Sequence, residues 1–347
     1  MGKADLLTHL SHAASEFPLT FRMKFLDIPI LCRTNSPHIA TFISFYFHPF
    51  KTLNDKEFPE LDLVFWESPD PKIYQELSEY EVSHEQKQLT DPGLEIRFGM
   101  ADGFERLIID ESITIVYLRD LGKAYLLSNG FQPLIKNQAV YKGILTLMNE
   151  HGRSRSLFFV HAATVAKNGL GISFCAASGV GKTTLAIAMA DQGLQIVDDD
   201  ISILDLRSDK ILVHSYSPNL NVTDETVERF ERLHILNTLP FGKGLEKRTF
   251  RFDEIFHDGW AKSCEAKAMA VLTRSKDKDH HARPISKTKA LEKLISQSLF
   301  VSDKAASMIH FDGLHRFVQS VRTYHMEVGP DFTGISKLVE DLIFERI

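Results

Sequence analysis

The 347-residue sequence lacks long apolar runs: no segment approaches the roughly 18 consecutive apolar residues of a membrane-spanning helix. Its opening, MGKADLLTHLSHAASEF, has one lysine and no apolar stretch of signal-peptide length. We therefore expect a cytoplasmic protein with no membrane partner. Cysteine is also scarce, and the three residues lie too far apart for a zinc site or a disulfide framework. We expect buried, reduced thiols at Cys32, Cys175 and Cys264.

Blocks of basic residues are missing too. The formal net charge is −6 and the lysines and arginines are scattered, so the sequence does not favour a nucleic-acid partner. There is no internal repeat and no low-complexity tract. With 44% hydrophobic and 25% charged residues, the composition is that of an ordinary folded protein. The length predicts two domains.

The first predicted domain covers residues 1–128. Apolar residues recur at strand spacing in LTFRMKFLDIPILCR, which predicts two strands around Asp27, and a helix is expected after Thr34-Asn35-Ser36-Pro37. Five more strand candidates follow, so we expect a smaller α+β domain with a mainly antiparallel sheet and an unknown role. An amphipathic helix from Gln132 to Asn149 then opens the second predicted domain, residues 129–347.

The second half contains a P-loop, or Walker A, pattern within GISFCAASGVGKTTLAIAMADQGLQIVDDD. A short apolar strand precedes the loop and a strong helix former follows it, which is the context that a phosphate site requires. Backbone N–H groups and the helix amino end would bind phosphates, Lys182 would reach the β- and γ-phosphates, and the Thr183 hydroxyl would ligate Mg²⁺. The predicted nucleotide-binding residues are Ala176, Ala177, Ser178, Gly179, Val180, Gly181, Lys182, Thr183 and Thr184. Ala176 stands where the usual pattern has glycine.

Three acids follow the loop at a distance that suits one helix, a glycine turn and one strand. Asp199 lies 17 residues after Lys182 (199 − 182), so we expect the acids to end a strand that returns directly beside the loop. Three adjacent carboxylates repel one another, and the Mg²⁺ of a bound nucleotide would compensate for this. Asp199 and Asp200 would then divide the work of base and metal ligand. Upstream, His161 lies beside an apolar run, where a core histidine and a catalytic one are both open readings.

The segment from His161 to Asp200 resembles the kinase domain of bacterial HPr kinase/phosphorylase and its HPr kinase-related relatives. In that family a histidine precedes the loop by the same interval, and an Asp-Asp pair follows one helix later. The resemblance implies a C-terminal α/β P-loop kinase domain of HPr kinase type, with ATP and Mg²⁺ as cofactors. It also implies Asp199 as the catalytic base, His161 as its helper, and Asp200 and Thr183 as metal ligands.

The family's E-I-R-G-x-G-I motif is missing, and TVERFERLHI occupies that region instead. The acceptor is therefore left as a hydroxyl, of serine type, on a protein, peptide or small molecule, and HPr itself stays open. Since the family often forms hexamers, the resemblance also makes a homo-oligomer an expectation.

The sequence thus predicts an ATP- and Mg-dependent kinase with Asp199, His161 and Lys182 as catalytic residues. Two alternatives stay open. A phosphoenolpyruvate carboxykinase-like enzyme shares a G-x-G-K-T-T loop followed by two acids, but such enzymes are longer. A regulatory protein that binds the nucleotide without transferring phosphate would carry the same loop.

Overall fold

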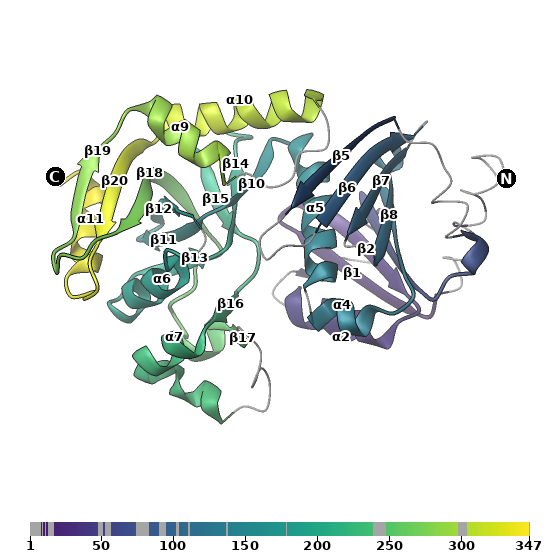
Figure 1. The fold of residues 1–347 in the computed structure, drawn as a ribbon, viewed down its shortest axis with the longest axis horizontal. Helices are drawn as coiled ribbons and strands as arrows, with labels where there is room; N and C mark the ends of the chain where they lie inside the picture. The colour runs from purple at the N-terminus through teal and green to yellow at the C-terminus, as the bar shows by residue number, and fades with distance from the viewer. Residues whose placement is uncertain are drawn as a thin grey trace. The chain divides into compact units, whose positions relative to one another are not determined.

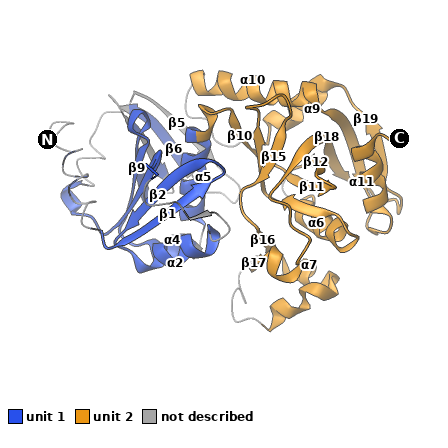
Figure 2. Cartoon of the chain, turned by 180° about the vertical axis from the view of Figure 1, so that it is seen from behind, with its two compact units in different colours: residues 1–151 blue, residues 152–347 orange. Residues whose placement is uncertain are grey.

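The chain folds into two compact units, residues 1–151 and residues 152–347, in a computed structural model (Figure 2). The two units divide after residue 151, near the end of the helix Ala139–Arg153, whereas the sequence places the boundary after residue 128. The end of this helix bonds to residues of unit 1. The Tyr117 hydroxyl lies 3.0 Å from His151 Nδ1, and Arg119 lies 3.3 Å from Glu150. The structure describes residues 8, 10, 12, 17–47, 51–52, 57–73, 83–89, 95–101, 104–109, 112–136, 138–177, 179–238, 248–297 and 304–346.

Unit 1 is built on a nine-stranded sheet of order β3-β1-β2-β4-β9-β8-β7-β6-β5. Only the β2–β4 and β4–β9 pairs are parallel, so the mainly antiparallel sheet that the sequence predicts is confirmed. In β2 every second residue is buried, which is the pattern of a strand with one face on a core. The strands are β1 (Leu19–Phe25), β2 (Ile28–Thr34), β3 (Lys51–Thr52), β4 (Leu61–Glu67), β5 (Ser83–Leu89), β6 (Glu95–Ala101), β7 (Phe104–Ile109), β8 (Ile113–Leu118) and β9 (Lys123–Ser128).

The first helix of unit 1 after β2 begins where the sequence supplies a capping group. Ser36 caps α2 (Pro37–Tyr46) by accepting a hydrogen bond from the N–H of Ile39, and a proline occupies the first turn. The single helix predicted from Gln132 to Asn149 is in fact two, α4 (Phe131–Lys136) and α5 (Ala139–Arg153). They are separate because Gln138 has a φ of +66°, which no right-handed helix contains. A short 3₁₀ turn, η1 (Arg119–Leu121), joins β8 and β9.

Unit 2 is a curved nine-stranded sheet with helices on both faces. Its main path is β10-β14-β15-β18-β12-β11-β13, and β20 pairs with both β18 and β19. One core lies between the sheet and the helices α6 (Lys182–Asp191) and α11 (Ile335–Phe344). A second core lies between the sheet and the helices α9 (Lys287–Ile295) and α10 (Lys304–Ser320). Figure 1 shows α9 and α10 lying together along this sheet. The strands are β10 (Leu157–His161), β11 (Ala163–Lys167), β12 (Leu170–Cys175), β13 (Gln195–Asp198), β14 (Ile201–Asp205), β15 (Leu212–Ser215), β18 (Ser263–Arg274), β19 (His281–Pro284) and β20 (Arg322–Val328).

The expectation that the acid-bearing strand lies directly beside the loop strand is wrong. Strand β11 lies between β12 and β13 and is antiparallel to both. Strands β11 and β12 form a hairpin around Asn168 and Gly169. Because β11 already occupies the position beside β12, β13 pairs with the other edge of β11. Because two antiparallel steps restore the direction, β12 and β13 still point the same way.

The remaining elements of unit 2 surround this sheet. The TVERFERLHI region forms α7 (Asp224–Arg229) and a 3₁₀ helix, η2 (Glu231–Asn237). A small two-stranded ribbon is made of β16 (Asn219–Val222) and β17 (Arg248–Arg251). The sequence also predicts helices at Lys287 to Leu299 and at Ile335 to Phe344, and they are present as α9 (Lys287–Ile295) and α11 (Ile335–Phe344). The sequence reading did not include α10 (Lys304–Ser320), and α8 (Phe252–Ile255) is a single turn. Among the described residues, no helix is long and apolar enough to cross a membrane.

Candidate functional site

A glycine-containing loop joins β12 to α6 (Lys182–Asp191), as the sequence predicts. Gly179 and Gly181 have φ values of +79° and +91°, in the region that favours glycine. Gly181 is also the residue that precedes the first turn of α6, so the loop ends on the helix amino terminus. Such a turn aims successive N–H groups at one point, where an anion can bind. Ser178 lies outside the described residues.

Lys182 is buried, and its ammonium group donates a hydrogen bond to the carbonyl oxygen of Ala176, 3.0 Å away. The lysine side chain therefore curls back over the loop to the residue where the loop begins. This contact brings a positive charge to the position that the loop encloses. Lysine has three N–H donors, and this bond uses one of them.

The two threonines that follow begin α6. Thr183 is half-buried in the first turn of the helix. The Thr184 hydroxyl lies 3.0 Å from the Thr226 hydroxyl. Thr226 lies in the first turn of α7, where its N–H donates to the capping Thr223 side chain. Thr184 therefore joins the loop helix to α7 through its side chain, while its backbone remains part of the helix start.

Asp198 ends β13 and is buried with a full set of donors. Its Oδ1 accepts hydrogen bonds from the N–H groups of Asp200 and Ile201, at 3.0 and 2.8 Å. Its Oδ2 accepts from the N–H of Tyr216 at 2.8 Å, with Ser215 and Ser217 at 3.4 Å. Burial raises the pKa of Asp198 to about 7, and these N–H groups limit the rise. Asp198 thus fastens the acid turn to the end of β15.

The other two acids are held differently. Asp199 is buried at the turn after β13, whereas Asp200 is about one-third exposed. The Asp200 Oδ1 lies 2.8 Å from Nδ1 of His161, which is the last residue of β10. The mutual repulsion expected of three carboxylates is therefore relieved in part by the protein itself, through His161 and the N–H groups around Asp198. Sequence reasoning foresaw the neighbourhood of His161 and the acids, but not which acid His161 contacts.

The acid turn and the phosphate loop lie at the same edge of the sheet. Thr164 in β11 pairs with Ser173 in β12 on one side and with Asp198 in β13 on the other, and the Thr164 and Ser173 hydroxyls are 2.8 Å apart. Two strand spacings of about 4.8 Å separate Asp198 from β12, so about 10 Å lies between them along the sheet. Since β12 and β13 run in the same direction, their carboxyl ends lie at the same edge of the sheet. Ligands of open α/β sheets bind at such an edge.

The contact between Arg274 and the loop was not predicted from the sequence. Arg274 ends β18, and its Nε donates a hydrogen bond to the carbonyl oxygen of Val180 at 2.9 Å. In the sequence this arginine opens a polar stretch that resembles an ordinary solvated loop. Its position at the end of a long apolar strand was the available signal, because β18 runs parallel to β12 and ends at the same edge.

Comparison with known proteins gives limited similarity. No family model matches the chain, and no curated protein does. Among solved structures, the HPr(Ser) kinase/phosphatase from Coxiella burnetii is similar to 54% of this chain and 89% of that chain, with 11% sequence identity and a TM-score of 0.31.

Proposed function

We propose that the chain is an ATP- and Mg-dependent kinase that transfers the γ-phosphate to a hydroxyl group, of serine type, on a protein, peptide or small molecule. One observation carries this proposal: the loop around Gly179 and Gly181 and the turn of Asp199 and Asp200 follow strands that end at the same sheet edge and lie two strand spacings, about 10 Å, apart. A nucleotide whose phosphates lie on the loop can therefore present its terminal phosphate toward the acids.

The residues of the loop fit a triphosphate. Two glycines with positive φ let the loop backbone turn tightly before α6, the α6 amino end adds partial positive charge, and Lys182 brings a full charge. Thr183 and Asp200 would hold Mg²⁺, a hard cation that prefers oxygen ligands and that neutralises charge on the transferred phosphate. Lys182 would stabilise the charge that spreads over the phosphate oxygens as the bond to the leaving group lengthens.

Asp199 would accept the proton of the acceptor hydroxyl as its oxygen attacks phosphorus. This carboxylate is buried at the turn, so it can meet an acceptor in a site from which water is partly excluded. His161, through its 2.8 Å contact with Asp200, would fix the orientation of that carboxylate and share its charge. Asp198 would act only through the turn, because all of its described contacts are with neighbouring backbone and serine donors.

The test combines binding with transfer. The full chain would be incubated with Mg²⁺, γ-labelled ATP and pools of serine-containing peptides or free hydroxy compounds. We expect Lys182→Ala to lose nucleotide binding, and Asp199→Asn to keep binding while transfer slows by about 10²- to 10⁴-fold. Asp209→Asn, in the exposed β14–β15 turn, is the matched control and should transfer at the wild-type rate.

Two results would count against the proposal. Wild-type protein that binds no ATP would remove the nucleotide site altogether. Tight ATP binding without transfer to any acceptor pool would favour a regulatory nucleotide-binding protein instead. If transfer occurs and Asp199→Asn leaves it near the wild-type rate, Asp199 is not the base.

A further inference from the structure

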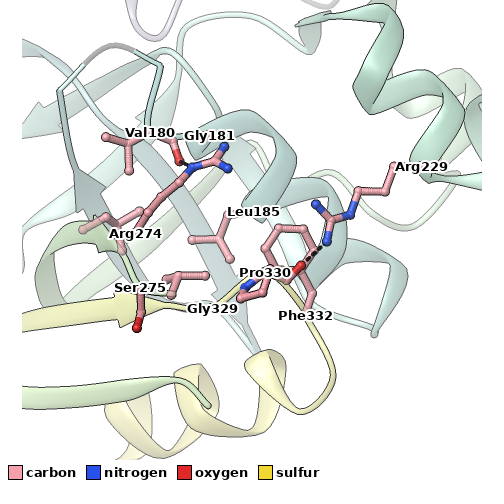
Figure 3. A pocket seen from close by; sticks show the side chains of 11 residues that line it. Val180, Gly181, Leu185, Arg229, Arg274, Ser275, Gly329, Pro330 and Phe332 are labelled. Carbon is pink, nitrogen blue, oxygen red and sulfur yellow. Dashed lines mark hydrogen bonds between the residues drawn. The ribbon is translucent and has the colours of Figure 1, made fainter. Parts of the chain in front are cut away.

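A hollow lies beside the phosphate loop on the side away from the acids. Figure 3 shows it between the loop, the end of β18 and the segment that follows β20. Its lining comes from four parts of the chain that are far apart in sequence, and β18 and β20 are parallel neighbours whose carboxyl ends meet here. The lining residues used below are Val180, Leu185, Arg229, Arg274, Ser275 and Phe332.

The strand order separates the hollow from the acid turn. Along the sheet the sequence of neighbours is β20, β18, β12, β11 and β13, so the phosphate loop at the end of β12 stands between them. Three strand spacings, about 14 Å along the sheet, separate β18 from β13. An acceptor hydroxyl must face Asp199 and so belongs on the β13 side. The hollow on the β18 side is left for the other end of the nucleotide.

The floor of the hollow is apolar. Val180 and Leu185 come from the loop and α6, and both pack against the hydrophobic core that α6 shares with the sheet. Phe332 is partly buried against the same core. A flat heterocyclic base needs such a surface, because its faces are apolar while its edges carry hydrogen-bonding groups.

The walls of the hollow carry two guanidinium groups. Arg229 lies over the Phe332 ring at 4.2 Å from the ring centroid and donates to the carbonyl oxygen of Pro330 (Figure 3). Arg274 is fixed by its bond to Val180, and its Nη2 lies 2.7 Å from the point where a Cβ on Gly181 would stand. Arg274 is therefore close to the loop that would hold the phosphates, and it brings a positive charge beside that loop.

We propose that this hollow is the subsite for the base and ribose of a nucleoside triphosphate, with the base against Val180, Leu185 and Phe332 and with Arg274 toward the α-phosphate. The inference rests on the proposed function, since it assumes that the loop binds the triphosphate. It adds the direction of the nucleotide along the sheet edge, from β20 through the loop to the acid turn.

The experiment compares two ligands on the full chain by titration calorimetry in the presence of Mg²⁺. ATP can use the loop and the hollow, whereas inorganic tripolyphosphate can use only the loop. We expect wild-type protein to bind ATP at least about tenfold more tightly. Phe332→Ala should weaken ATP binding by about tenfold and leave tripolyphosphate binding unchanged, because only the apolar floor is altered. Phe311→Ala, an exposed phenylalanine on α10, is the matched control and should bind both ligands as the wild type does.

A second variant covers the case in which Phe332→Ala does not fold. Ser275→Trp would fill the hollow from its rim, and it should abolish the preference for ATP over tripolyphosphate. Photolabelling with 8-azido-ATP gives an independent readout: the labelled peptides should contain residues 180–185, 272–275 or 328–332.

The outcomes separate this inference from the proposed function. Equal affinity of wild-type protein for ATP and tripolyphosphate, or an undiminished preference in both Phe332→Ala and Ser275→Trp, overturns the subsite and leaves the phosphate loop standing. Binding of neither ligand overturns both. Label confined to peptides of the acid turn would reverse the proposed direction of the nucleotide.

Discussion

Replacement of Asp198 by asparagine tests how the acid turn is held. The carboxyl group is buried and accepts hydrogen bonds from the N–H groups of Asp200, Ile201 and Tyr216. Asparagine keeps nearly the same shape but cannot titrate, and its amide nitrogen would face one of these donors. The difference in stability between wild type and Asp198→Asn therefore isolates the titration of this one group, since other groups contribute equally to both proteins.

The magnitude follows from the pKa of Asp198. Burial raises this pKa from its ordinary value of 3.8 to about 7. Between these two values the native protein keeps a proton that the unfolded chain has released, so the free energy of unfolding falls as pH rises. A window of about three pH units at about 1.4 kcal/mol per unit gives a loss of about 4 kcal/mol. The stabilising contribution is complete below pH 3.8 and is lost once the pH has passed about 7.

Urea unfolding between about pH 4 and pH 8 measures this difference directly. We expect the stability of wild type relative to Asp198→Asn to decline steadily across that range and then level off. Asp205→Asn is the control: although burial opposes it, hydrogen bonds from Arg207 and His214 hold the pKa of Asp205 below its ordinary value. The difference in the free energy of unfolding between wild type and Asp205→Asn should be constant above about pH 5 and shrink only in more acidic solution. A wild-type advantage over Asp198→Asn that grows with pH would refute the reasoning, because backbone donors would then outweigh burial.

Two further predictions concern the phosphate loop and the thiols. Gly181→Ala should lower the free energy of unfolding by about 1 to 2 kcal/mol in urea, because a side chain is strained at a φ of +91°. It should also weaken ATP binding by displacing Arg274. Unchanged stability and binding would contradict the loop geometry. Burial raises the pKa of each cysteine thiol, to about 12 for two of them. A thiol reagent should therefore react with no cysteine in the native protein and with all three in urea. Fast reaction of any cysteine in the native protein would disagree with the structure. The cysteines are Cys32, Cys175 and Cys264.

Several local features followed from the sequence because neighbouring residues determine them. The strand before the phosphate loop and the helix after it are present where an apolar run and a strong helix former predict them. Ser36 and the following proline begin α2 by satisfying its first N–H groups, and alternation of apolar residues marks β2. In each case the cause acts over a few residues, so the spacing alone carries the information.

Tertiary structure decided which of these segments meet. The insertion of β11 between β12 and β13, the contact of His161 with Asp200, and the approach of Arg274 to a loop carbonyl 94 residues earlier all depend on strand order. Strand order is set by the burial of both faces of a sheet against helices, which is a property of the whole unit and leaves no periodic mark in the sequence. The sequence by itself therefore determined the glycine-containing loop between β12 and α6 and the three acids as local features. Only the packing of β10 to β20 decided that Asp198 anchors the acid turn and that an arginine-walled hollow stands on the other side of the loop.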